Sequence, residues 1–293
     1  MRLAVTTLVA VLFAFVSCAD GAHWTLENTA LRLTFAGEEK GFAVESVETL
    51  LGNGARFVNP AAQGAASFWE LGFRRGAKNR ASGVRLSNLS PCRAKRVVRN
   101  EDGGATFVWE GLDLGAEKGV VTVFARIAFT AAGTSEWTLE VKNESPDYGL
   151  FDTRYPILPR VALSGEADAL VPWKDLGARF VRKLEWGSCR PRWGCMGYAP
   201  MMMAFFKGDA GLYFAAHDSE ARIKTLFVSR EHDLSFETPV ENGGLPGKAA
   251  AGPRYAVTVA ALKGDWWSAA RLYRSWALTT PWTAKGPIVA RKD

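Results

Sequence analysis

The sequence predicts an all-β fold, a large antiparallel β-sandwich with one helix at its C-terminal end. Three observations lead to this prediction. Apolar and polar residues alternate with a period of two in many segments, Gly and Asn or Asp separate these segments, and one segment near the C-terminus has helical spacing. Alternation with a period of two places one side of a strand in a core and the other towards solvent. Parallel strands would need helical crossovers, and the sequence predicts none.

The composition is that of a globular protein, and it argues against several functions. The chain has 293 residues, of which 48% are hydrophobic, and a net charge of +6. A chain of this length can bury roughly three quarters of its unfolded surface. The basic residues are scattered, whereas nucleic-acid binding needs a basic stripe or patch. Only three His are present, and no phosphate-binding or metalloprotease motif occurs, so we expect no metal, no cofactor and no nucleic-acid partner.

Residues 1–19 have the pattern of a signal peptide. A short positive start is followed by the apolar run Leu3–Val16 and by small residues at 17–19. The run is shorter than the roughly 20 residues of a transmembrane span. Phe15–Cys18 also resembles a lipobox, so either Cys18 is lipidated or the chain is cleaved after Ala19. We expect an exported protein that is secreted, periplasmic or lipid-anchored at the cell envelope.

Residues 20–263 are expected to form the sandwich. The alternating apolar positions of its clearest strands are Leu31, Leu33 and Phe35; Trp69, Leu71 and Phe73; Trp137, Leu139 and Val141; and Tyr255, Val257 and Val259. The run Val120–Phe129 is apolar on both faces, which predicts a central strand. Gly and Asn tolerate the positive φ of tight turns. The turn signals are Gly52-Asn53-Gly54, Asp102-Gly103-Gly104, Gly208–Gly211 and Asn242-Gly243-Gly244.

Residues 264–293 are expected to form a helix and a linker. Asp265 is a suitable N-cap, and Thr280-Pro281 ends the helical pattern. Trp266, Tyr273 and Trp276 recur along one stripe, which we expect to lie against the sheet. Trp267 points about 100° away from Trp266, so a further domain could cover it. Without that domain, we expect self-association through this region.

Two blocks of sequence resemble known carbohydrate-active proteins. The first resembles the opening of a galactose-mutarotase-like supersandwich, and consists of Leu26–Phe35, Gly41–Val44 and Gly54–Phe57. The second is similar to exported, glycosidase-like bacterial proteins of the DUF6259 type, and consists of Met201–Phe206, Gly211–Asp218, Lys224, Gly264–Ala277 and Pro281-Trp282. In such proteins the helix leads into a (β/α)8 barrel. The resemblance therefore implies a chain that ends before its catalytic barrel.

This resemblance implies a non-catalytic N-terminal sandwich of an exported glycoside-hydrolase-like protein, which supports the barrel and helps to shape a sugar site. Carbohydrate and the barrel are the expected partners. A second hypothesis is a stand-alone carbohydrate-binding module at the cell surface. A third, based on fold analogy alone, is a mutarotase-type epimerase with His217 as acid and Glu237 as base. Glycosidases use two carboxylates, and no catalytic pair is identifiable, since Glu136 and Glu140 fit a solvent-exposed face. Whether the chain is an enzyme stays open.

Two short segments supply the candidate sugar-binding residues. Trp186, Arg190, Arg192 and Trp193 lie in one predicted loop. Trp stacks on sugar rings and Arg contacts hydroxyl or carboxylate groups, but the loop could equally pack against a partner domain. His217 and Asp218 follow the predicted strand Leu212–Ala216. A His beside an Asp could orient a hydroxyl or donate a proton; the alternative is a turn Asp with a partly exposed His.

Cys189 and Cys195 enclose five residues of the same loop. In an exported protein they could form a disulfide, or they could remain two free thiols. Their spacing does not match Cys-x-x-Cys, so a zinc site is not expected.

Overall fold

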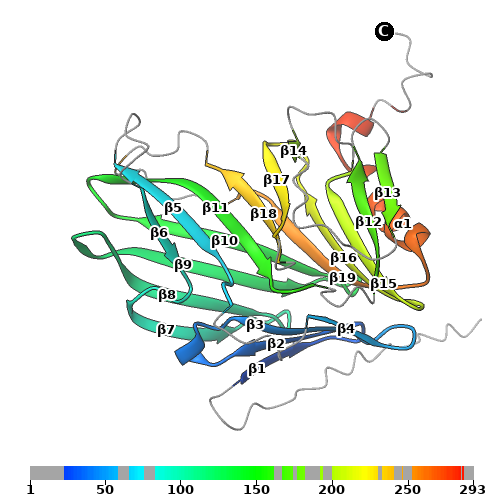
Figure 1. Ribbon diagram of the computed structural model, residues 1–293, viewed down its shortest axis with the longest axis horizontal. Helices are drawn as coiled ribbons and strands as arrows, with labels where there is room; N and C mark the ends of the chain where they lie inside the picture. Colours follow the sequence, from blue (N-terminus) through cyan, green and yellow to red (C-terminus); the bar gives the residue numbers. More distant parts are fainter. Residues whose placement is uncertain are drawn as a thin grey trace, which may run out of the picture.

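Three antiparallel sheets and one α-helix form the structure, a computed structural model (Figure 1). It describes residues 23–58, 66–75, 83–161, 167–173, 177–181, 192–193, 200–229, 233–240, 246, 253–284 and 286. The predicted all-β class with one C-terminal helix is confirmed. The predicted signal peptide with Cys18, and the turn signal Asn242-Gly243-Gly244, lie outside the described residues. Among those described, no helix is long and apolar enough to cross a membrane.

Each sheet combines strands that are distant in sequence. In spatial order, the four-stranded sheet contains β1 (His23–Glu27), β2 (Leu31–Ala36), β3 (Val44–Thr49) and β4 (Ala55–Val58). The nine-stranded sheet contains β13 (Gly177–Val181), β12 (Asp168–Trp173), β15 (Met202–Lys207), β16 (Ala210–His217), β19 (Ala256–Lys263), β10 (Ser135–Asn143), β9 (Glu117–Phe129), β8 (Ala105–Leu114) and β7 (Cys92–Arg99). The six-stranded sheet contains β14 (Arg192–Trp193), β17 (Lys224–Val228), β18 (Leu234–Pro239), β11 (Tyr148–Leu158), β5 (Glu70–Arg75) and β6 (Val84–Ser87).

The strands follow the alternation in the sequence closely. The predicted segments at 31–35 and 137–141 lie within β2 and β10, while Trp69 and Tyr255 precede β5 and β19 by one residue. Three predicted turns join β3 to β4, β7 to β8 and β15 to β16, with positive φ at Gly52, Gly103 and Gly208. Strand β9 lies between β8 and β10, an interior position as predicted. The expectation of burial on both of its faces is wrong, because Arg126 and its neighbours on that side face solvent.

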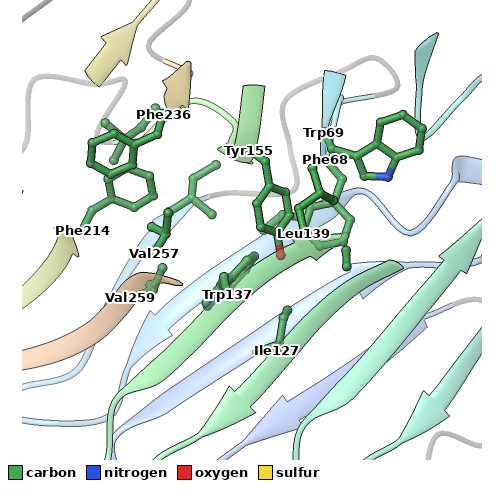
Figure 2. Close-up of a cluster of buried hydrophobic side chains, with 14 of the residues drawn as sticks. Phe68, Trp69, Ile127, Trp137, Leu139, Tyr155, Phe214, Phe236, Val257 and Val259 are labelled. Atoms are coloured by element: carbon green, nitrogen blue, oxygen red, sulfur yellow. The ribbon is translucent and has the colours of Figure 1, made fainter. Parts of the chain in front are cut away.

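One core lies between the sheets. The six-stranded sheet contributes Phe236 and Tyr155, and Phe68 lies just before its strand β5. In Figure 2 these rings point towards Trp137 and Val257 of the nine-stranded sheet. Phe35 of the four-stranded sheet joins them, with ring centroids 4.7 Å from Phe107 and 6.0 Å from Trp137. Buried aromatic side chains remove roughly 150–250 Å² each from solvent, so this cluster ties the three sheets into one unit.

Helix α1 (Trp266–Ala277) covers the opposite face of the nine-stranded sheet, over β15, β16 and β19. As predicted, Asp265 is its N-cap and accepts a hydrogen bond from the Trp267 amide at 2.9 Å. Its inward side begins at the buried Ala269 and continues through Leu272 and Tyr273. The predicted stripe is therefore wrong at Trp266, which lies one turn before these contacts begin and is 45% exposed. A short 3-10 helix, η2 (Pro281–Thr283), follows.

Candidate functional site

His217 and Asp218, adjacent in sequence at the end of β16, point to opposite faces of the nine-stranded sheet. Phe214 and Ala216 belong to the core between the sheets, whereas Tyr213 belongs to the cluster under α1. Because side chains alternate along a strand, Asp218 continues the core side and His217 the α1 side. The two candidates therefore do not act on one group.

His217 holds α1 against the sheet. Its Nε2 lies 3.0 Å from Tyr213 Oη and its Nδ1 lies 2.9 Å from Thr258 Oγ1. The imidazole stacks on Trp276, with centroids 4.7 Å apart and planes inclined by 3°. Burial lowers the pKa of His217 from 6.5 to about 4, so the ring is neutral at pH 7. Both nitrogens and one ring face are engaged, which is the geometry of a packing residue.

Asp218 organises the turn after β16 and is almost completely buried. Its carboxylate accepts hydrogen bonds from Lys224 Nζ at 2.6 Å, Arg222 Nη1 at 2.8 Å, and the amides of Glu220 and Arg222. Burial alone would raise the pKa of Asp218, but the hydrogen bond and charge of Lys224, together with the hydrogen bonds from the amides of Arg222 and Glu220, hold the pKa below its ordinary value. A turn Asp was one of the two interpretations from the sequence, although its burial in an ion pair was not expected.

The proposed acid–base pair of His217 and Glu237 is wrong. Glu237 lies on β18 between Phe236 and Thr238, which face the core. Alternation therefore places Glu237 on the outer face of the six-stranded sheet, while His217 lies on the outer face of the nine-stranded sheet. The core separates the two residues, so they cannot act on one sugar.

The outer face of the six-stranded sheet gathers charged side chains that no local sequence pattern groups. We call this surface the Arg154 face; it consists of Glu70, Gly72, Arg74, Arg85, Phe151, Asp152, Arg154, Phe227, Ser235 and Glu237. In the strand register, Glu70 pairs with Arg154, and Arg154 pairs with Glu237. The core residues Leu71, Tyr155 and Phe236 alternate with this row, so the three charged residues point outwards together.

Arg154 is at the centre of the face and its side chain is only 15% exposed. Its Nε donates to Ser235 Oγ at 2.8 Å, and its Nη1 lies 3.5 Å from Glu70 Oε2. The guanidinium carbon lies 4.5 Å from the centre of the Phe227 ring. The Nη2 atom is buried, and none of the described residues forms a hydrogen bond with it. One strong donor in the middle of the face is therefore unsatisfied by the described residues.

Two further carboxylates lie on the same face as Arg154. Glu237, the register partner of Arg154, makes no hydrogen bond or ion pair with any residue that the structure describes. The Asp152 carboxylate lies over Gly72, where a Cβ would come within 2.7 Å of both oxygens. Arg85 Nη1 approaches Asp152 Oδ1 at 3.2 Å. An unpaired carboxylate and a guanidinium on neighbouring strands offer hydrogen bonds to a group that both donates and accepts them, such as a hydroxyl.

The predicted sugar-binding loop reaches the same sheet. Arg192 in β14 pairs with Thr225, which pairs with Glu237, so the backbone of Arg192 continues the row from Glu70. Only the backbones of Arg192 and Trp193 are described. Trp186, Arg190 and the candidate disulfide of Cys189 and Cys195 lie outside the described residues.

A metal site is not evident in this part of the molecule. Within the described ranges, no group of three or more His, Cys, Asp or Glu side chains is placed to hold a metal ion. The Arg154 face presents hydrogen-bonding groups, charge and aromatic rings.

The sequence carried only a weak signal for this face. Glu70 and Gly72 alternate with the predicted apolar positions Trp69, Leu71 and Phe73, and Glu237 was the expected base of the epimerase hypothesis. Asp152 and Arg154 also alternate with core residues, but outward charges are common on any sheet. Their grouping depends on which strands pair.

No family model matches the chain, and no curated protein matches it in sequence. Solved structures that resemble it include a 4-alpha-glucanotransferase from Thermococcus litoralis, with a TM-score of 0.40 and 12% identity over 84% of this chain and 38% of that chain. Galactose 1-epimerase from Lactobacillus acidophilus NCFM has a TM-score of 0.49 and 11% identity, over 83% and 95% of the two chains. A GalM/aldose epimerase homologue from C. elegans has a TM-score of 0.43 and 8% identity, over 83% and 100%.

Proposed function

We propose that this chain is the non-catalytic sandwich of an exported carbohydrate-active protein, and that it binds carbohydrate on the Arg154 face. One observation carries the proposal: among the described residues the buried Arg154 Nη2 has no hydrogen-bond partner, its guanidinium lies against the Phe227 ring, and its register partner Glu237 is unpaired on the same face.

The chemistry of the face fits a sugar. A buried donor without a partner costs about 1–3 kcal/mol, so an arriving acceptor removes an existing penalty. A sugar hydroxyl can accept from Arg154 and donate to Glu237, while the apolar side of the ring packs on Phe227. The charges of the face cancel, since Glu70, Asp152 and Glu237 oppose Arg74, Arg85 and Arg154. A neutral sugar therefore suits it better than an anion.

Binding also fits better than epimerisation. The acid–base pair that an epimerase would need is divided between the two outer faces, and His217 is neutral and fully engaged in packing. The Arg154 face, by contrast, has the donors, acceptors and aromatic surface of a recognition site.

Binding to an array of neutral oligosaccharides and polysaccharides tests the proposal. We expect the chain to bind a subset of them, and Arg154→Met to weaken that binding at least about tenfold, the effect of losing a hydrogen bond from a charged group. Arg126→Met is the matched control, because Arg126 forms an exposed ion pair with Asp102 on the outer side of the nine-stranded sheet. If Arg154→Met fails to fold, Glu237→Gln replaces it, since that change keeps the shape of the side chain. Absence of binding to every glycan, or equal binding by the Arg154 and Arg126 variants, would contradict the proposal.

Export is part of the proposal, and the apolar run Leu3–Val16 supports it. Mass spectrometry of the protein from fractionated cells tests it. A chain beginning at Asp20 indicates ordinary cleavage, and a diacylated N-terminal Cys18 indicates a lipoprotein. A full-length chain found in the cytoplasm would contradict export.

A (β/α)8 barrel of a DUF6259-type protein is the partner that we propose for α1. Trp266 is 45% exposed and Trp267 is 57% exposed. Two neighbouring exposed indole rings support the proposal that a further domain covers this surface. Sequencing the gene beyond codon 293 tests this part. In-frame strand–helix repeats would support it, whereas a stop codon would contradict it and favour a stand-alone surface module.

A further inference from the structure

The Arg154 face contains a second cation–aromatic unit beside the first. The guanidinium carbon of Arg74 lies 3.2 Å from the centre of the Phe151 ring. Arg74 and Glu70 are four residues apart on β5 and share its outer side. At about 3.4 Å per residue, their Cα atoms are about 14 Å apart along the strand.

A β-bulge places Phe151 in this unit. The register of β11 against β5 shifts between Leu150 and Asp152, so Phe151 is the extra residue. Bulges re-aim side chains that would otherwise alternate. Here the bulge allows Phe151 and Asp152, neighbours in sequence, both to contribute to the outer face.

Asp152 lies between the two units. Its carboxylate occupies the space over Gly72 and receives Arg85 from the side. A side chain at position 72 would displace the carboxylate, so the glycine leaves room for Asp152 in the middle of the face. The order along β5 is thus Glu70 with Arg154, then Gly72 with Asp152, then Arg74 with Phe151.

We infer that the Arg154 face has two adjacent sugar subsites, one at Arg154 and Phe227 and one at Arg74 and Phe151, and that its ligand is a neutral oligosaccharide rather than a monosaccharide. This inference rests on the proposed function. Each subsite offers a guanidinium and an aromatic ring, and Asp152, opposite Gly72 in the register, lies between them along β5. The length of the row exceeds that of a single pyranose ring.

Calorimetric titration with glucan and galactan oligomers of one to four hexose units tests the inference. We expect affinity to rise at least about tenfold from the monosaccharide to the trisaccharide, because the second subsite adds its own charged hydrogen bond. Arg74→Met should remove that gain and leave the monosaccharide affinity within about twofold. Arg154→Met should lower the affinity for every oligomer that binds. Arg75→Met is the control, because Arg75 is not part of the Arg154 face and forms an exposed ion pair with Asp147 at the end of the strand.

The outcomes separate the two proposals. If no oligomer binds, the proposed function itself fails. If monosaccharide and trisaccharide bind equally well and Arg74→Met changes neither, carbohydrate binding stands and the second subsite is wrong. Should Arg74→Met be unstable, Gly72→Ala provides the second test, since displacing Asp152 should reduce the gain with chain length while Arg154 remains in place.

Discussion

His217 and Trp276 stack face to face, with their ring centroids 4.7 Å apart and their planes inclined by 3°. This contact joins the last residue of β16 to the inner side of α1. A second link lies nearby, where the Met201 amide donates to Tyr273 Oη at 3.2 Å. The attachment of the helix therefore involves a titratable ring that folding has buried.

The first prediction concerns the pH dependence of stability. Burial lowers the pKa of His217 from 6.5 to about 4, so between these values the unfolded chain binds a proton that the folded chain does not. The free energy of unfolding should therefore fall as the pH decreases from 6.5 to 4, by up to about 3 kcal/mol from this residue. Urea unfolding at pH 7 and pH 4.5 measures it. His217→Gln should show a smaller drop than the wild type; an identical drop would contradict the assignment.

The second prediction compares two buried tyrosines. None of the described residues forms a hydrogen bond with Tyr155 Oη, whereas Tyr255 Oη lies 2.6 Å from Thr238 Oγ1. Tyr155→Phe removes an unsatisfied hydroxyl and should raise the free energy of unfolding by about 1 kcal/mol, while Tyr255→Phe should lower it by a similar amount. Thermal and urea unfolding of the two variants provide the comparison. If both variants lose the same free energy of unfolding, Tyr155 Oη has a hydrogen-bond partner and the prediction is wrong.

The third prediction concerns the buried ion pair of Asp218 and Lys224. Lys224 is completely buried, and besides Asp218 its ammonium donates to the Arg222 carbonyl at 2.6 Å. Lys224→Met should destabilise the protein by about 3 kcal/mol, because it leaves a buried carboxylate with less compensation. Adding Asp218→Asn should recover part of this loss, since the two residues are coupled. Arg126→Met, at an exposed ion pair, should cost at most about 1 kcal/mol. Additive losses in the double variant would contradict the pairing.

The fourth prediction concerns self-association through α1. Trp266 and Trp267 are in contact at 5.6 Å between centroids and both are strongly exposed. We expect light scattering of the mature chain to show association that increases with concentration, because exposed aromatic surface is removed from water in a contact. Replacing both with Ser should abolish it. Phe180→Ser is the control, since Phe180 is a comparably exposed aromatic on the edge strand β13. A wild-type chain that stays monomeric at high concentration would refute the prediction.

The candidate site was harder to predict than the fold, and His217 and Asp218 show why. Their position at a strand end was predicted correctly, because the run Leu212–Ala216 and the following polar residues are local signals. Their separation follows from the pleat of a strand, which sends neighbours to opposite faces. The burial of Asp218 depends on Lys224, which comes from a different strand of a different sheet.

The sequence by itself determined the strands, several turns and the helix with its Asp265 cap, because period-two alternation, positive φ at Gly and side-chain capping act within a few residues of the chain. Only the tertiary structure decided that Glu70, Arg154 and Glu237 lie in one row. These residues are more than eighty positions apart along the chain, and their meeting depends on strand order and register. Register is set by how the inner faces pack in the shared core, so the outer face is a consequence of contacts that no local pattern contains.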